Sequence, residues 1–173
     1  MQGFDPLQSF GPDVAARYDE DARGDEPETV GFLAELAGDG PVLEFAIGTG
    51  RIALPLAEKG PRVDGIEQSS AMVDVLRAKP GGAELAVTVG DMSTVALPDR
   101  YSLVYLIFNT IHNLITQDRQ VRCFENAARH LSEDGVFVLE TGVPWARPRT
   151  GSYVDVIKLG LEEVRLVRIS TTR

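Results

Sequence analysis

Short apolar segments alternate with longer amphipathic segments through most of the chain. The apolar segments have the length of strands and lie at residues 42–46, 63–66, 85–89, 103–108 and 136–140. Between them, apolar residues recur at helical spacing, which predicts helices at residues 50–59, 71–78 and 117–131. This alternation is typical of an α/β fold, in which right-handed crossovers place helices on both faces of a parallel sheet.

The two ends of the chain follow other patterns. Residues 1–40 are expected to form a helical arm or lid, because Gly, Pro, Ser and Gln are frequent at its start and helical spacing follows at 14–22 and 27–37. Residues 153–159 and 163–170 alternate like two strands, which predicts an antiparallel hairpin.

The length of the chain favours a single domain. We expect residues 1–173 to form one domain, with a core at residues 41–142 and a β-hairpin extension at residues 151–173.

Residues 42–53 run from a strand into a glycine turn that opens a helix. Gly48-x-Gly50-x-x-Ala53 fits the dinucleotide-binding pattern, in which a ligand approaches the backbone at a helix N-terminus. Glu44 lies inside the strand, and its carboxylate would repel a pyrophosphate. A ligand with a cationic amino group gains from that carboxylate. S-adenosylmethionine (SAM) is such a ligand, because its ammonium and its sulfonium are both positive.

Polar groups also follow the next two strands, at the edge where doubly wound sheets bind ligands. Glu67 lies 17 residues after Gly50, close to the place of an acid that accepts hydrogen bonds from a ribose. Asp91 is a candidate acceptor for the amino group of an adenine, and Met92 is a candidate apolar wall.

Glu44-x-x-x-Gly48-x-Gly50, Glu67, Gly90-Asp91-Met92 and the apolar strand ending at Phe108-Asn109 resemble, in this order, the class I SAM-dependent methyltransferases. The resemblance covers residues 14–142. It implies a Rossmann-like doubly wound sheet of strand order 3-2-1-4-5, with SAM or S-adenosylhomocysteine (SAH) as the cofactor. The cofactor-binding residues that it implies, including a tyrosine that closes over the cofactor, are Tyr18, Glu44, Ala46, Gly48, Thr49, Gly50, Arg51, Glu67, Gln68, Met72, Asp91, Met92, Phe108 and Asn109.

The segments 108–114 and 153–173 further resemble bacterial small-molecule methyltransferases, including sugar N-methyltransferases. Some of those enzymes carry a histidine at the position of Asn113, whereas here the histidine is His112. His112 is the candidate catalytic base, because an amine acceptor must lose a proton.

The resemblance also implies two further strands after the fifth, which the chain does not show. An unpaired strand edge invites pairing. We therefore expect residues 151–173 or a second copy of the chain to cover this edge, which predicts a homodimer formed through the hairpin.

Three functions stay open at this point. The first is methyl transfer to a nitrogen or oxygen of a small molecule, and the second is a catalytically impaired SAM-binding protein or fragment. The third is an NAD(P)-dependent oxidoreductase, which Glu44 disfavours because the dinucleotide carries a pyrophosphate.

The composition excludes several partners. A net charge of −9 argues against sequence-independent binding to nucleic acid and against an anionic membrane surface. Two histidines and one cysteine form no metal-ligand pattern, so no metal is expected. The N-terminus lacks the pattern of a signal peptide, and we expect a bacterial protein of the cytoplasm with a small-molecule acceptor.

Overall fold

A computed structural model describes residues 9–20, 24–142, 152–159 and 164–170. The chain divides into two compact units, residues 1–141 and 142–173. The predicted core lies in the first unit, apart from its last residue, and the predicted hairpin lies in the second. That residues 1–173 act as one domain stays a prediction.

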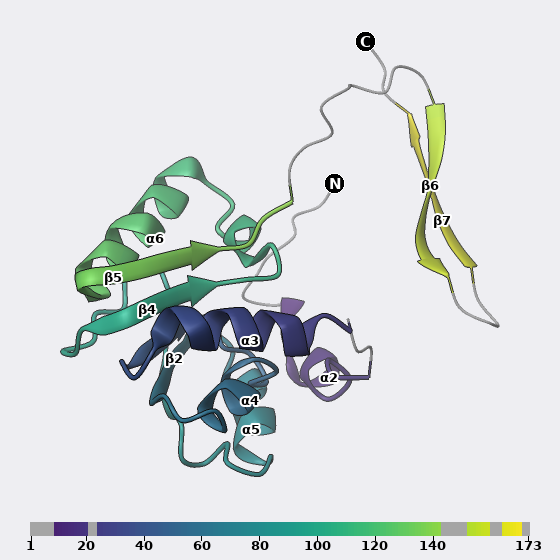
Figure 1. The fold of residues 1–173 in the computed structure, drawn as a ribbon. Helices are drawn as coiled ribbons and strands as arrows, with labels where there is room; N and C mark the ends of the chain where they lie inside the picture. Colours follow the sequence, from purple (N-terminus) through teal and green to yellow (C-terminus); the bar gives the residue numbers. More distant parts are fainter. Residues whose placement is uncertain (1–8, 21–23, 143–151, 160–163, 171–173) are drawn as a thin grey trace. The chain divides into compact units, whose positions relative to one another are not determined.

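The first unit is an α/β unit in which strands and helices alternate (Figure 1). Its strands are β1 (Val42–Phe45), β2 (Val63–Glu67), β3 (Ala86–Val89), β4 (Tyr101–Leu106) and β5 (Leu131–Leu139). Its helices are α2 (Pro12–Ala15), α3 (Glu26–Ala37), α4 (Ala53–Ala57), α5 (Ser70–Arg77), the 3-10 helix η1 (Thr110–Asn113) and α6 (Gln117–His130).

The five strands form one parallel sheet in the order β3-β2-β1-β4-β5, which confirms the predicted doubly wound topology. Strand β1 is central, and Val42 lies opposite Val63 of β2 on one side and Leu103 of β4 on the other. The order of the strands reverses between β1 and β4. A crevice at the carboxyl ends of these two strands is where such sheets bind ligands.

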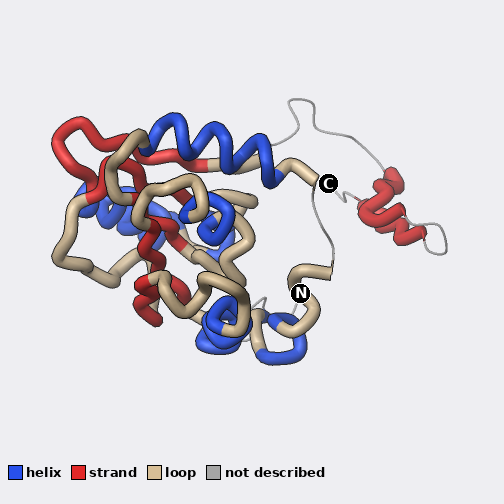
Figure 2. Tube along the Cα trace, turned by 60° about the horizontal axis from the view of Figure 1, so that its bottom comes forward, coloured by secondary structure: helices blue, strands red, loops and turns tan. Residues whose placement is uncertain are grey.

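Alternate residues of the strands face two separate hydrophobic clusters. Val42 and Leu103 belong to the cluster that also holds residues of α3 and α4, such as Leu33 and Leu56. Leu43 and Val104 belong to the cluster that holds Cys123 and Ala127 of α6. Helices therefore cover both faces of the sheet, and in both views the strands lie between helices (Figures 1 and 2).

Several elements have other bounds than the pattern predicted. The helix predicted at residues 14–22 is the short α2, which begins at Pro12 because the fixed φ of proline suits a first turn. Helix α4 is shorter than predicted. Strand β5 begins at Leu131, earlier than predicted, because Leu131 pairs with Tyr101. The register then shifts, and regular pairing follows from Leu103 and Val136 onward.

The second unit contains the antiparallel hairpin of β6 (Ser152–Leu159) and β7 (Val164–Ser170), as predicted. Its two strands form a sheet of their own, and β5 is an edge of the five-stranded sheet among the described residues. No helix in the described part of the chain is long and apolar enough to cross a membrane.

Candidate cofactor and substrate site

The turns after β1 and β4 have an unusual backbone. Ala46, Phe108 and Asn109 adopt positive φ angles of 55°, 59° and 61°. Non-glycine residues rarely adopt this region, and such strain gathers at functional sites. Glu140 holds the second turn, because Phe108 N donates to its carboxylate at 2.9 Å and Asn109 N to its carbonyl at 3.3 Å.

The two glycines of the predicted motif have different surroundings. Gly48 has a φ of 57°, and a Cβ placed there would meet only the carbonyl oxygen of Ala46, at 3.9 Å. A Cβ on Gly50 would lie 2.6 Å from Cδ1 of Leu76. Gly48 therefore leaves room for a ligand, whereas Gly50 allows the turn to pack against α5.

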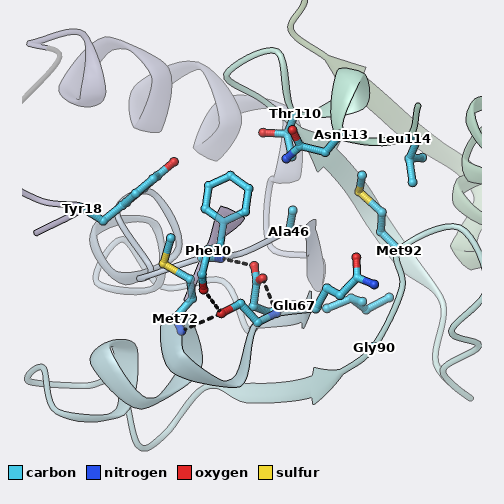
Figure 3. Close-up of a pocket in the computed structure, with 14 residues that line it drawn as sticks. Phe10, Tyr18, Ala46, Glu67, Met72, Gly90, Met92, Thr110, Asn113 and Leu114 are labelled. Atoms are coloured by element: carbon cyan, nitrogen blue, oxygen red, sulfur yellow. Dashed lines mark hydrogen bonds between the residues drawn. The ribbon is translucent and has the colours of Figure 1, made fainter. Parts of the chain in front are cut away.

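The first cavity lies at the carboxyl ends of β1, β2 and β3 and encloses about 710 Å³, counting the solvent at its opening. Its lining consists of Phe10, Tyr18, Ala46, Gly48, Ile66, Glu67, Gln68, Ser69, Met72, Gly90, Met92, Thr110, Asn113 and Leu114. Figure 3 shows the aromatic rings of Phe10 and Tyr18 on one side and the side chains of Met92 and Leu114 on the other.

Glu67 presents a carboxylate at the base of this cavity (Figure 3). Its two oxygens accept hydrogen bonds from Gly48 N and Ser69 N, both at 2.8 Å. Burial raises the pKa of Glu67 in spite of these bonds. Because a carboxylate has about four acceptor positions, Glu67 keeps capacity for the hydroxyls of a ligand.

The second cavity is smaller, about 360 Å³, and lies at the carboxyl ends of β1 and β4. Its lining consists of Tyr18, Glu44, Ala46, Ile47, Gly48, Thr49, Arg51, Ile52, Ile107, Phe108 and Thr110. Glu44 is 4% exposed and accepts a hydrogen bond from the Tyr105 hydroxyl at 2.7 Å. Burial, aided by repulsion from Glu67, raises the pKa of Glu44 well above its usual range.

Four residues line both cavities: Tyr18, Ala46, Gly48 and Thr110. The cavities therefore meet beside the glycine turn, and each contains one buried carboxyl group. Such a pair of cavities matches a ligand with two polar ends and a cationic group near one of them.

The structure brings most of the predicted cofactor residues to these cavities. Three predicted residues line neither cavity: Gly50, Asp91 and Asn109. Asp91 instead accepts from Ser93 and pairs with Arg119 at 2.6 Å. Burial raises the pKa of Asp91, but the hydrogen bonds from Ser93 and Arg119 outweigh it and hold that pKa below its usual value.

His112 also lies outside the lining of both cavities. Its side chain is exposed, and its Nε2 lies 3.1 Å from the Thr141 hydroxyl. The residues of η1 that do line the first cavity are Thr110 and Asn113. A catalytic role for His112 stays a prediction.

The sequence reasoning missed Phe10 and Ser69. Phe10 lies near the start of the predicted N-terminal arm, and its carbonyl accepts a hydrogen bond from Ser69 Oγ at 2.6 Å. Ser69 also caps α5, because its Oγ accepts from Met72 N at 3.2 Å. The sequence signal was the serine pair before the amphipathic segment at residues 71–78. The described residues contain no cluster of acidic, histidine or cysteine side chains that would hold a metal ion.

A family model described as "Methyltransferase domain" matches residues 42–135, more than half of the chain. The chain belongs to the class I SAM-dependent methyltransferases. The predicted resemblance and fold class are thereby confirmed. The match begins at β1 and ends within β5, so it includes the strands whose ends form the two cavities.

Two curated relatives of this methyltransferase chain come from Streptomyces. The dTDP-3-amino-3,6-dideoxy-alpha-D-glucopyranose N,N-dimethyltransferase of Streptomyces fradiae is 30% identical over 159 residues, covering 86% of this chain and 60% of the relative. The cypemycin N-terminal methyltransferase of a Streptomyces species is 26% identical over 131 residues, covering 76% and 54%. The chain thus spans less than two thirds of the length of these relatives.

Solved methyltransferase structures share the fold. The CcbJ methyltransferase from Streptomyces caelestis superposes with a TM-score of 0.81 at 36% identity, covering 92% of this chain and 68% of that one. SAM-bound CalS10, an amino pentose methyltransferase from Micromonospora echinaspora, gives a TM-score of 0.71 at 25% identity, covering 93% and 69%.

Proposed function

We propose that this chain transfers a methyl group from SAM to the amino nitrogen of a small, sugar-like acceptor. The observation that carries the proposal is the pair of joined cavities with Glu67 in the first and Glu44 in the second. The relatives named above support nitrogen rather than oxygen as the acceptor atom, since three of them are described as acting on an amino sugar or an N-terminus.

The second cavity fits the methionine part of SAM. The Glu44 carboxylate is the anion in reach of an ammonium, and the Arg51 guanidinium lines the same cavity and suits a carboxylate. The first cavity fits the nucleoside, with Glu67 accepting from ribose hydroxyls and Met72 and Met92 beside the base. When bound, SAM supplies an electrophilic methyl group on a positive sulfur whose leaving group is neutral.

The chain's own residues then align the acceptor and exclude water. Tyr18 and Thr110 line the place where the cavities meet, and Asn113 offers an amide on the side of η1. The acceptor nitrogen must be neutral to attack. We propose that His112, which is exposed and therefore accessible to solvent, takes the released proton.

Calorimetry with SAH tests the binding half of this proposal. We expect the chain to bind SAH and to show no heat with NAD⁺. Glu44→Gln keeps the shape of the side chain but removes its charge, so SAH affinity should fall by roughly thirtyfold or more, because removal of one partner of a buried charge pair costs about 2–5 kcal/mol. Equal SAH affinity of both proteins would contradict the assigned role of Glu44.

Methyl transfer is tested separately with an amino sugar nucleotide and with the same compound carrying a hydroxyl in place of the amine. Methylation of the amine alone supports the proposal. Binding of SAH without any transfer would favour the alternative of a catalytically impaired SAM-binding protein. The acidic net charge of −9 supports a small-molecule acceptor over nucleic acid or an anionic membrane, and we propose a cytoplasmic location.

A further inference from the structure

An ion-pair cluster joins the N-terminal segment to the glycine turn. Thr49 Oγ1 donates to one carboxylate oxygen of Asp19 at 2.7 Å, and Lys79 Nζ lies 2.6 Å from the other. Lys79 Nζ also donates to the carbonyl of Thr49 at 2.7 Å. Asp19, Thr49 and Lys79, which we call the latch, therefore form a closed ring of contacts from three separate parts of the chain.

The latch is buried at Thr49 and partly exposed at its two charged ends. Thr49 is 1% exposed, and the side chains of Lys79 and Asp19 are 29% and 37% exposed. Burial raises the pKa of Asp19, but the hydrogen bonds from Lys79 and Thr49 outweigh it, so the net pKa is below the usual value. The carboxylate is therefore ionised at neutral pH, as the ring of contacts requires.

The segment that the latch holds contains two walls of the first cavity, Phe10 and Tyr18. Their rings meet edge to face, with centroids 6.2 Å apart. The Phe10 end is fastened to α5 through Ser69 Oγ. Tyr18 directly precedes Asp19, so the latch fastens the other end beside the glycine turn.

Arg51 connects the latch to the second cavity. Its guanidinium donates to the carbonyl of Tyr18 at 2.9 Å and lies over the Tyr18 ring, 5.2 Å from the centroid. It also lies 3.5 Å from Glu26 and 4.0 Å from Asp19. The segment that the latch fastens therefore also positions the guanidinium of Arg51, which lines the second cavity.

We propose that Asp19 and Lys79 are positioning residues for the cofactor site, which hold Tyr18 and Arg51 in the geometry that binds the cofactor. Neither lines a cavity, so each acts only through the segment that it fastens. This inference rests on the proposed function for its ligand, but the latch itself can be tested without one.

Loss of the latch reduces the fraction of molecules in which the segment is closed over the site. The observed affinity falls in proportion to that fraction. We therefore expect Lys79→Met to raise the Kd for SAH and the KM for SAM by roughly three- to tenfold. The kcat at saturating SAM should stay within about twofold, because the bound state is the same.

Two variants show whether charge at this position is what matters. Lys79→Arg keeps the cation and should recover most of the affinity. Arg62→Met is the matched control, since it removes the pairs with Asp99 at 2.8 Å and with Asp64 at 3.3 Å, both of which lie outside the two cavities. It should leave the SAH affinity unchanged. Asp19→Asn combined with Lys79→Met should weaken binding little more than either change alone, because both remove one interaction.

Hydrogen exchange on the full chain without ligand tests the latch directly. The amide of Tyr18 donates to the carbonyl of Ala15. We expect this amide and its neighbours to exchange faster in Lys79→Met than in the wild type, and no change in Arg62→Met. Unchanged exchange together with an unchanged Kd for SAH would overturn the latch. A wild type that binds no SAH, but whose exchange responds to Lys79→Met, would overturn the proposed function instead.

Discussion

A single residue, Glu44, shows how the fold arranges a charge in its interior. It lies opposite Tyr105 in the register of β1 and β4, and the Tyr105 hydroxyl donates to its carboxylate at 2.7 Å. Burial still dominates and raises the pKa of Glu44 well above its usual range. In the absence of a cationic ligand, this group opposes the stability of the folded chain.

The pH dependence of stability follows from that raised pKa. Below the unfolded pKa, near 4.5, Glu44 is protonated in both states and carries no penalty. As the pH rises from the unfolded pKa to the higher folded pKa, the unfolded chain ionises first, so the free energy of unfolding falls. Glu44→Gln should therefore unfold at a higher temperature than the wild type near pH 7, with a smaller gap at pH 4.5.

Thermal unfolding at several pH values measures this difference. For a domain of this size, about 1 kcal/mol corresponds to a shift of roughly 2–4 °C. The same variant is expected to bind SAH more weakly, so the carboxylate would favour function at the expense of stability. A stability gap that shrinks as the pH rises would contradict this account.

The glycine turn allows a second comparison at the scale of residues. An alanine at Gly50 would crowd Leu76, whereas one at Gly48 would meet open space. Both positions have positive φ, so both substitutions share the conformational cost. We expect Gly50→Ala to be less stable than Gly48→Ala by about 1–3 kcal/mol, the usual cost of overpacking, in urea denaturation. Equal losses would show that the packing against α5 is unimportant.

At the scale of elements, α6 supports the loop that carries Met92. Asn126 donates through its amide to the carbonyls of Met92 and Val95, both at 2.8 Å. His130 Nε2 accepts from Leu97 N at 2.8 Å, and its Nδ1 lies 2.8 Å from the carbonyl of Asn126. Helix α6 thus fixes the backbone of Met92, which lines the first cavity.

Removal of the Asn126 amide tests this support. Asn126→Ala leaves two carbonyls without their donor, and each unsatisfied buried group costs about 1–3 kcal/mol. We expect a loss of roughly 2–4 kcal/mol in urea denaturation and a weaker affinity for SAH. Gln117→Ala, at an exposed position of the same helix, is the control and should change little.

At the scale of the whole molecule, the unpaired edge of the sheet at β5 bears on the oligomeric state. Strand β5 pairs only with β4 among the described residues. Val136 on β5 and Phe124 on α6 are 40% and 46% exposed, and the Phe124 ring packs against Phe137 with centroids 5.5 Å apart. An edge strand beside exposed apolar side chains favours pairing with a further strand or a second copy.

Light scattering over a range of concentrations checks the predicted homodimer. We expect the chain to dimerise and Val136→Lys to shift the equilibrium toward the monomer, because a lysine on an edge strand opposes pairing. A wild type that stays monomeric at every concentration would contradict the dimer.

Local sequence signals determined the doubly wound sheet and most of the candidate site. Strand length, helical spacing and glycine placement are local properties, and parallel strands bring their carboxyl ends to one edge whatever the details of packing. Glu44, Glu67 and the turn at Gly48 could therefore be assigned before their contacts were known.

Tertiary structure decided which of the assigned residues line the cavities. Asp91 and His112 follow the ends of β3 and β4, but neither lines a cavity, since Asp91 pairs with Arg119 and His112 lies beside Thr141. Phe10 and the latch were invisible in the sequence, because their partners lie 30 or more residues away in the chain. The hydrophobic pattern predicts where each strand ends. The orientation of each polar side chain there depends on partners that only folding brings into contact.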